Sequence, residues 1–148
     1  MGTRSAIGYK TPEGKIRAKY SHYDGYPAYT GQMLLDHYQQ SRKIAQMVEL
    51  GDQSFLEKEI FPTGEHSFEK PEDGVTIFYG RDRGETGVDT REFETFADFV
   101  EHYQDCWCEY FYVYDGRDWL VHARDDKDDN GWPIFDFVDV HVKPGMMA

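Results

Sequence analysis

Two aromatic stretches separated by a tight turn constrain the fold of this chain more than any other feature. Residues 107–114 and 118–124 are rich in Tyr, Trp, Phe and Val, and Asp115-Gly116 stands between them. An Asp-Gly pair favours the short turns of β-hairpins because its residues tolerate positive φ. We therefore expect an antiparallel strand pair late in the chain, and a fold built on a sheet.

A second hairpin is expected at the N-terminus. Residues 3–11 and 15–23 are separated by a Thr-Pro-Glu-Gly turn at 11–14. The second of these strands alternates apolar and polar side chains, which is the pattern of a strand with two different faces. One predicted face carries Ile16, Ala18, Tyr20 and His22, and the other carries Lys15, Arg17, Lys19 and Ser21.

Helices and further strands are expected between and after these hairpins. Apolar residues at helical spacing predict one helix that begins near Thr30, a second capped by Ser41 and a third capped by Thr95. Short apolar runs predict buried strands at 75–79 and 134–142, and a Gly-rich loop follows the first of them.

This order of elements predicts a single α+β domain over residues 1–148. We expect a mostly antiparallel sheet with about three helices packed on one face, and a frayed tail at 143–148. The chain has no apolar run of about 18 residues, so no membrane span is expected. Its N-terminus lacks a signal-peptide pattern, and Cys106 and Cys108 fit a reducing compartment, so we expect a cytoplasmic protein.

The charge of the chain is strongly negative and unevenly distributed. The formal net charge is −12, but residues 1–60 carry eight Lys and Arg against seven Asp and Glu, whereas residues 61–148 carry eight against 21. Such a field repels a phosphate backbone, so direct binding to nucleic acid is not expected. It suits a partner protein with a basic surface, or simply a well-solvated surface.

No metal or cofactor is expected. Two cysteines are too few for a zinc site, and no nearby pair of histidines completes one. The acidic run at 125–130 resembles a calcium loop in composition but not in the spacing of its ligands.

The first candidate site is the end of the second predicted strand. His22 enters a turn that holds Asp24, and an imidazole beside a carboxylate can transfer protons or orient a ligand. The alternative is a structural histidine, because His22 shares its predicted face with Tyr20.

The second candidate site is the Gly-rich segment around Arg81 and Arg83. Two arginines close to glycines allow guanidinium and backbone groups to approach an anion together. The spacing is not that of a Walker or dinucleotide-binding loop. The alternative is an exposed loop in which the arginines pair with Asp82, Glu85 or Asp89.

Several of these motifs together resemble a family of small proteins from tailed bacteriophages and some bacteria. The resemblance covers roughly residues 2–100 and rests on Gly-Thr-Arg-Ser at 2–5, His-x-Asp-Gly-Tyr-Pro at 22–27, Leu-Leu-x-His-Tyr at 34–38 and Phe-Tyr-Gly-Arg-Asp-Arg-Gly-Glu at 78–85. It implies an accessory protein that acts in the cytoplasm of the infected cell, in host takeover or in evasion of antiviral defence. It implies no reaction.

The polar residues of these motifs predict one shared pocket. Our hypothesis is that Arg4, His22, Arg81 and Arg83 converge at one end of the sheet and bind a small anionic ligand such as a nucleotide or a nucleotide-derived signal, with Tyr26 or Tyr79 stacked on its base. The expected ligand-binding residues are Arg4, Ser5, His22, Asp24, Tyr26, Tyr79, Arg81, Arg83 and Glu85.

Two other functions stay open from the sequence. One is an acidic interaction protein that mimics nucleic acid and blocks a host protein. The other is a small hydrolase or phosphodiesterase in which His22 works with Asp24 or Glu85 as acid and base. No nucleophile motif is present, so a protein without enzymatic activity is the favoured reading.

Overall fold

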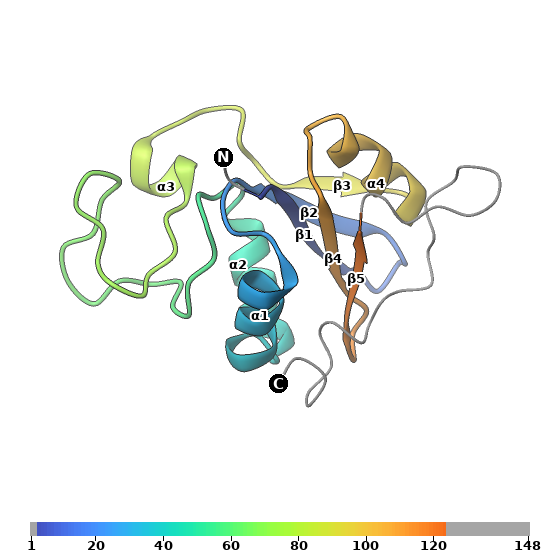
Figure 1. Ribbon diagram of the computed structural model, residues 1–148, viewed down its shortest axis with the longest axis horizontal. Helices are drawn as coiled ribbons and strands as arrows, with labels where there is room; N and C mark the ends of the chain where they lie inside the picture. The colour runs from blue at the N-terminus through green and yellow to red at the C-terminus, as the bar shows by residue number, and fades with distance from the viewer. Residues whose placement is uncertain (1–2, 124–148) are drawn as a thin grey trace.

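The protein is described by a computed structural model in which residues 3–123 are placed. They build one five-stranded mixed sheet (Figure 1) with the strand order β3-β2-β1-β4-β5. The strands are β1 (Ser5–Lys10), β2 (Ile16–Ser21), β3 (Arg91–Phe93), β4 (Tyr110–Tyr114) and β5 (Trp119–Ala123). The first strand of the sequence is therefore the central strand of the sheet.

Most neighbouring strands run antiparallel, as predicted. β1 pairs antiparallel with β2, β2 with β3, and β4 with β5, whereas β1 and β4 are parallel. Both expected hairpins are confirmed. The second has a four-residue loop, 115–118, in which the Asp115 N–H donates to the Asp118 carbonyl at 3.1 Å and Gly116 has a φ of 102°.

Of the four α-helices within residues 3–123, three were expected from the sequence. α1 (Gln32–His37) follows directly on one π-helical turn at Pro27–Gly31, and α2 spans Ser41–Glu49. α4 (Phe96–Gln104) is capped by Thr95, whose hydroxyl accepts the Asp98 N–H at 3.1 Å. The predicted cap at Thr30 is wrong. Its hydroxyl instead donates to the Asp24 carbonyl at 2.7 Å, so it closes the turn before α1.

The helices cover both faces of the sheet, not one as expected. α1 and α2 lie on one side and α4 lies on the other (Figure 1). The reason is visible in β1, where Ile7 packs under α1 and α2 while the adjacent Ala6 packs under α4, both without exposed surface. A strand that is apolar on both sides needs cover on both.

The buried run at 75–79 does not form the predicted strand. Residues 75–78 are buried in irregular structure with isolated bridges, such as the one between Gln53 and Phe78. A short helix, α3 (Tyr79–Arg83), replaces the predicted loop. It begins where the Asp82 carboxylate accepts the Phe78 N–H at 2.8 Å, and it ends at Gly84, whose φ is 74°.

The described residues belong to one α+β domain with a hydrophobic core on each face of the sheet. Within residues 3–123, no helix has both the length and the apolarity to cross a membrane. The predictions for the acidic run 125–130, the strand 134–142 and the tail 143–148 lie outside the described residues.

Candidate functional site

The strand directions bring three chain segments to one end of the sheet. Ser5 begins β1 and pairs with Ser21, the last residue of β2, and with Tyr110, the first residue of β4. The next residues beyond these three strand ends are Arg4, His22 and Glu109. The Glu109 N–H donates to the Arg4 carbonyl at 2.8 Å. The start of β1 and the loop between α4 and β4 are therefore at the same end of the sheet (Figure 1).

The short segment 52–54 joins α3 to the same end. The His22 N–H donates to the carbonyls of Gln53 and Ser54 at 3.1 and 3.0 Å. The Tyr79 N–H donates to the Asp52 carbonyl at 3.0 Å. Segment 52–54 therefore lies between the end of β2 and the start of α3 and bonds to both. We call the side chains of Arg4, Tyr20, His22, Tyr23, Tyr79 and Arg83 the strand-end cluster.

His22 is paired with a tyrosine inside this cluster. Its Nδ1 lies 2.7 Å from the Tyr20 hydroxyl, and its ring makes an edge contact with Tyr23 at a centroid distance of 4.4 Å. Burial, and then the positive charge of Arg4, lower the pKa of His22. At neutral pH the imidazole is therefore uncharged, and its Nε2 can donate or accept a hydrogen bond according to the tautomer.

The electrostatic couplings connect the two halves of the strand-end cluster. Burial raises the pKa of the Tyr20 hydroxyl, the Arg4 charge opposes that rise, and Tyr79 adds to it. Burial also raises the pKa of Tyr79, while a hydrogen bond from the Ser54 side chain and the Arg83 charge oppose it. Tyr20 thus lies within electrostatic range of both Arg4 and Tyr79, and Tyr79 within range of Arg83.

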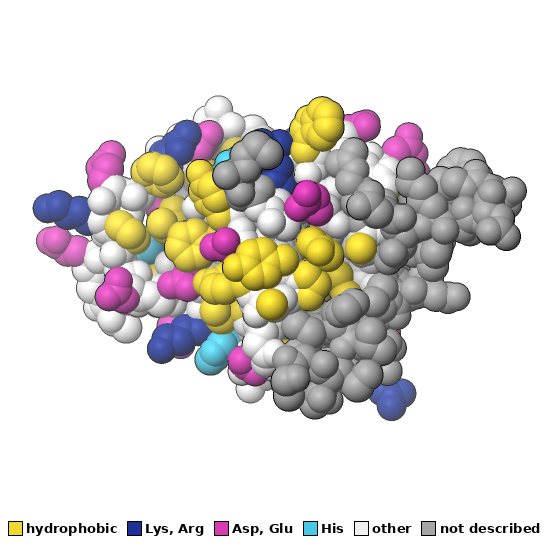
Figure 2. All heavy atoms as spheres, in the orientation of Figure 1, with side chains coloured by type: hydrophobic (Ala, Val, Ile, Leu, Met, Phe, Trp, Pro, Cys, Tyr) yellow, Lys and Arg dark blue, Asp and Glu magenta, His cyan; other side chains and the backbone are white. Residues whose placement is uncertain are grey.

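The Arg83 guanidinium packs against two aromatic rings. Its guanidinium carbon lies 4.7 Å from the ring centroid of Phe68 and 5.4 Å from that of Tyr79, within the range of cation–π contacts. It also pairs with Glu85 at 3.1 Å, and its side chain is 46% exposed. Tyr23 and Phe68 are exposed as well. Figure 2 shows hydrophobic side chains gathered on this face over the segment between β2 and α1.

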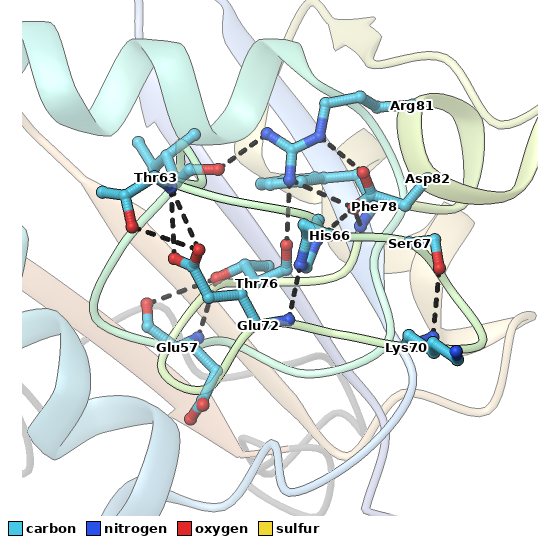
Figure 3. A network of polar contacts seen from close by, with 11 residues as sticks. Glu57, Thr63, His66, Ser67, Lys70, Glu72, Thr76, Phe78, Arg81 and Asp82 are labelled. Atoms are coloured by element: carbon cyan, nitrogen blue, oxygen red, sulfur yellow. Dashed lines mark hydrogen bonds and ion pairs between the residues drawn. The ribbon is translucent and has the colours of Figure 1, made fainter.

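Arg81 is used inside the fold and does not belong to the strand-end cluster. Its guanidinium donates to the carbonyls of Ile60 and Thr76 at 2.6 and 3.1 Å and to the Asp82 carboxylate at 2.7 Å (Figure 3). It also lies over the ring of Phe78 at 4.8 Å. In a helix, residues two apart point about 200° away from each other, so α3 separates two arginines that an extended loop would have placed side by side.

The remaining predicted site residues have different surroundings. Ser5 is fully buried against Gly25, where an added Cβ would meet the Ser5 Cβ at 2.5 Å, so Ser5 is closed to a ligand. Tyr26 is exposed and packs its ring against Tyr29. Asp24 has a φ of 56° and forms no hydrogen bond with His22 in the described part of the chain, so the predicted pair of His22 with Asp24 is not formed.

Comparison with protein-family models, curated proteins and solved structures finds no match. The site is therefore described from its own geometry. No group of three or more His, Cys, Asp or Glu side chains within residues 3–123 is arranged to hold a metal ion.

Sequence reasoning missed three members of the site region. Tyr20 could have been found, because alternation along β2 places it on the face of His22. Tyr23 and Phe68 had no signal, since their positions depend on how the segments around 54 and 79 fold over the end of β2.

Proposed function

We propose that this chain is a non-enzymatic ligand-binding protein, and that its strand-end cluster binds a small anionic, nucleotide-derived ligand. The observation that supports it is the arrangement of Arg4 beside His22 on one side and Arg83 over Tyr79 and Phe68 on the other. Cations that bind phosphate and ring faces that stack on a base are the two features such a ligand requires. The resemblance to phage proteins gives the proposal its setting, an accessory role in the cytoplasm of the infected cell.

The charge of the whole chain favours a small ligand over a polymer. A duplex would lay a long phosphate backbone against a surface of net charge −12, which repels it. A mononucleotide or dinucleotide needs only the local positive charge of Arg4 and Arg83.

The hydrogen bonds of the cluster favour binding over hydrolysis. To act as a general acid or base, His22 would need a carboxylate that orients its imidazole or exchanges a proton with the same substrate. The Tyr20 hydroxyl holds Nδ1 of His22, and Glu85 pairs with Arg83. His22 and Glu85 thus each have a partner other than one another, which supports binding over acid–base catalysis by this pair.

The proposal is tested by removing the two cations together. Nucleoside mono-, di- and triphosphates and a cyclic dinucleotide are titrated into the full-length protein by isothermal calorimetry. We expect Arg4→Ala/Arg83→Ala to weaken the best of these ligands by about 100-fold, because each charge-assisted hydrogen bond contributes about 1.5 kcal/mol and about 1.4 kcal/mol is tenfold in affinity.

The matched control is Lys10→Ala/Arg42→Ala. Both of these side chains are exposed, and Lys10 lies at the opposite end of β1 from Arg4, so the control removes the same charge elsewhere. It should bind as tightly as the wild type. Equal losses in the two double variants, or no binding of any of these ligands to the wild type, would exclude the proposed function.

A further inference from the structure

Phe68 reaches the strand-end cluster on a loop, and not on a helix or strand. We call the segment from Thr63 to Glu72 the Phe68 loop. Its two ends are joined, because the Glu72 carboxylate accepts the Thr63 N–H at 3.1 Å. Between them, the Phe68 N–H donates to the Asp82 carbonyl at 3.2 Å, and the Phe68 ring packs against Arg83. The position of that ring therefore depends on how the loop is attached to α3.

The His66 side chain joins the Phe68 loop to α3. It is almost fully buried, with 1% of its surface exposed. Its Nε2 lies 3.1 Å from the Asp82 carboxylate, and its Nδ1 accepts the Glu72 N–H at 3.0 Å (Figure 3). Asp82 immediately precedes Arg83 in α3. One imidazole thus connects the end of the loop to the helix that carries the cation.

These two bonds determine the tautomer and the charge of His66. Nδ1 can accept the Glu72 N–H only as an unprotonated nitrogen, so the ring proton is on Nε2 and is donated to Asp82. The imidazole is neutral in this arrangement. A second proton, on Nδ1, would face the Glu72 N–H and break that bond. The closed loop therefore requires the neutral form of His66.

The charges around His66 act on its protonation in opposite directions. The carboxylates of Asp82 and Glu72 attract a proton to the ring, and the pKa of Glu72 is itself lowered by the Thr63 N–H and, to a lesser extent, by His66. The Arg81 guanidinium, 2.7 Å from the Asp82 carboxylate, opposes a further positive charge. An imidazole in water takes up its second proton around pH 6.5, so mild acid is the condition that tests the bond to Glu72.

We infer that His66 is a positioning residue of the ligand site. As a neutral imidazole it closes the Phe68 loop against α3 and keeps the Phe68 ring on Arg83, and its protonation opens the loop and weakens binding. The inference rests on the proposed function and deepens it. It makes binding of the nucleotide-derived ligand depend on pH through a buried side chain that does not touch the ligand.

The test measures the affinity of the tightest-binding nucleotide of the titrations above, by calorimetry on the full-length protein, at about pH 7.5 and about pH 5.5. Protonation of the ligand and of His22 affects wild type and variants alike and cancels in their comparison. His66→Asn has an amide oxygen in the place of Nδ1 that accepts the Glu72 N–H at either pH, so it should bind like the wild type at the higher pH. On acidification the wild type should lose about fivefold more affinity than this variant, which is the factor for one broken hydrogen bond.

Three further variants separate positioning from a general effect on the fold. His66→Gln has an amide N–H that reaches Asp82 but no acceptor in the place of Nδ1, so it should bind about fivefold more weakly than the wild type even at the higher pH. Phe68→Ala should bind more weakly and show no additional loss on acidification, because His66 acts through the Phe68 ring. His37→Asn is the matched control, since His37 is exposed on α1, and it should keep the wild-type pH dependence.

The other outcomes separate the two proposals. Nitrogen NMR of the wild-type imidazole should place the proton of His66 on Nε2 at neutral pH, and a proton on Nδ1 would overturn the inference without recourse to any variant. Equal pH dependence of binding in the wild type and in either His66→Asn or Phe68→Ala would also overturn it and leave the proposed function in place. If the wild type binds no nucleotide at either pH, both proposals fail.

Discussion

At the scale of single residues, Lys19 is the largest departure from what its position in the sequence indicates. Alternation along β2 placed it on a polar face, yet it is fully buried beneath α2. Its Nζ donates to the Met47 carbonyl at 2.7 Å and to Oε1 of Gln53, and it lies 4.4 Å from the ring centroid of Phe78. Burial, opposed by the charge of Asp52, lowers the pKa of Lys19 well below its usual value.

The buried amine predicts a pH-dependent stability. In the unfolded chain Lys19 keeps its proton up to about pH 10.4, whereas the folded state binds it less well. The free energy of unfolding should therefore rise with pH between the lowered folded pKa and the unfolded one. Urea denaturation between pH 7 and pH 9.5 should show this rise in the wild type and a flatter dependence in Lys19→Met.

Lys10→Met serves as the control, because that side chain is exposed. It should keep the wild-type slope. A Lys19→Met variant with the same slope as the wild type would mean that Lys19 stays protonated in the core. The sequence could not reveal this burial, since it depends on where α2 and residue 53 pack against β2 and not on the strand itself.

At the scale of elements, α3 and the irregular segment before it are held by one carboxylate. Asp82 accepts hydrogen bonds from the Phe78 N–H, Arg81 and Nε2 of His66, and its side chain is 4% exposed. Nδ1 of His66 accepts the Glu72 N–H at 3.0 Å (Figure 3), which extends the network across the segment. Although burial raises the pKa of Asp82, the bonds from Arg81 and the Phe78 N–H leave it lowered.

Asp82→Asn should destabilise the protein at neutral pH. It leaves Arg81 without its charged partner, and breaking such a partly buried pair costs about 2–4 kcal/mol of unfolding free energy. Because the folded pKa is lowered, the stabilisation by Asp82 is present above about pH 3.9 and is lost as the pH falls through the folded pKa. In urea denaturation, the difference in unfolding free energy between variant and wild type should therefore be full at pH 7 and should shrink as the pH falls below about 3.9.

Asp73→Asn is the matched control, since Asp73 is exposed in the same segment. It should leave stability nearly unchanged across this pH range. Equal effects of the two substitutions would show that the Asp82 network contributes nothing to stability.

Local signals in the sequence predicted some elements and not others. The hairpins and the Thr95 cap were predictable because their turn and capping residues act on their immediate neighbours. α3 was not, because it depends on the side chain of Asp82 bonding back to Phe78. In the site, the sequence singled out His22 and Arg83 as candidate ligand-binding residues. It did not predict that Arg81 points away from Arg83, because that separation depends on α3.

At the scale of the whole molecule, the sequence predicted the fold class and the direction of most strands, but not the cover of both faces. The polar side chains along β2 indicated one solvated face. This face of β2 is instead covered by α2, because Lys19 is buried beneath that helix and the Arg17 guanidinium pairs with Glu49 of α2. The alternation of a single strand cannot show which polar groups another element will satisfy.

The net charge predicts how salt affects the whole molecule. At −12 the folded chain repels itself, and its exposed ion pairs, such as Lys15 with Glu94, contribute little individually. Raising the salt from about 0.01 M to about 0.15 M shortens the screening length from roughly 30 to roughly 8 Å. The melting temperature measured by calorimetry should rise over this range, and a fall would mean that the ion pairs outweigh the repulsion.

The central position of β1 affects how the protein can fold during its synthesis. On the ribosome, β1 and β2 emerge first and can pair at once, but the other edge of β1 stays open until Tyr110–Tyr114 has left the exit tunnel. Until β4 has emerged, the nascent chain thus presents an unpaired edge of β1, of the kind that recruits other strands. Pairing of β1 with β4 therefore follows the pairing of β1 with β2.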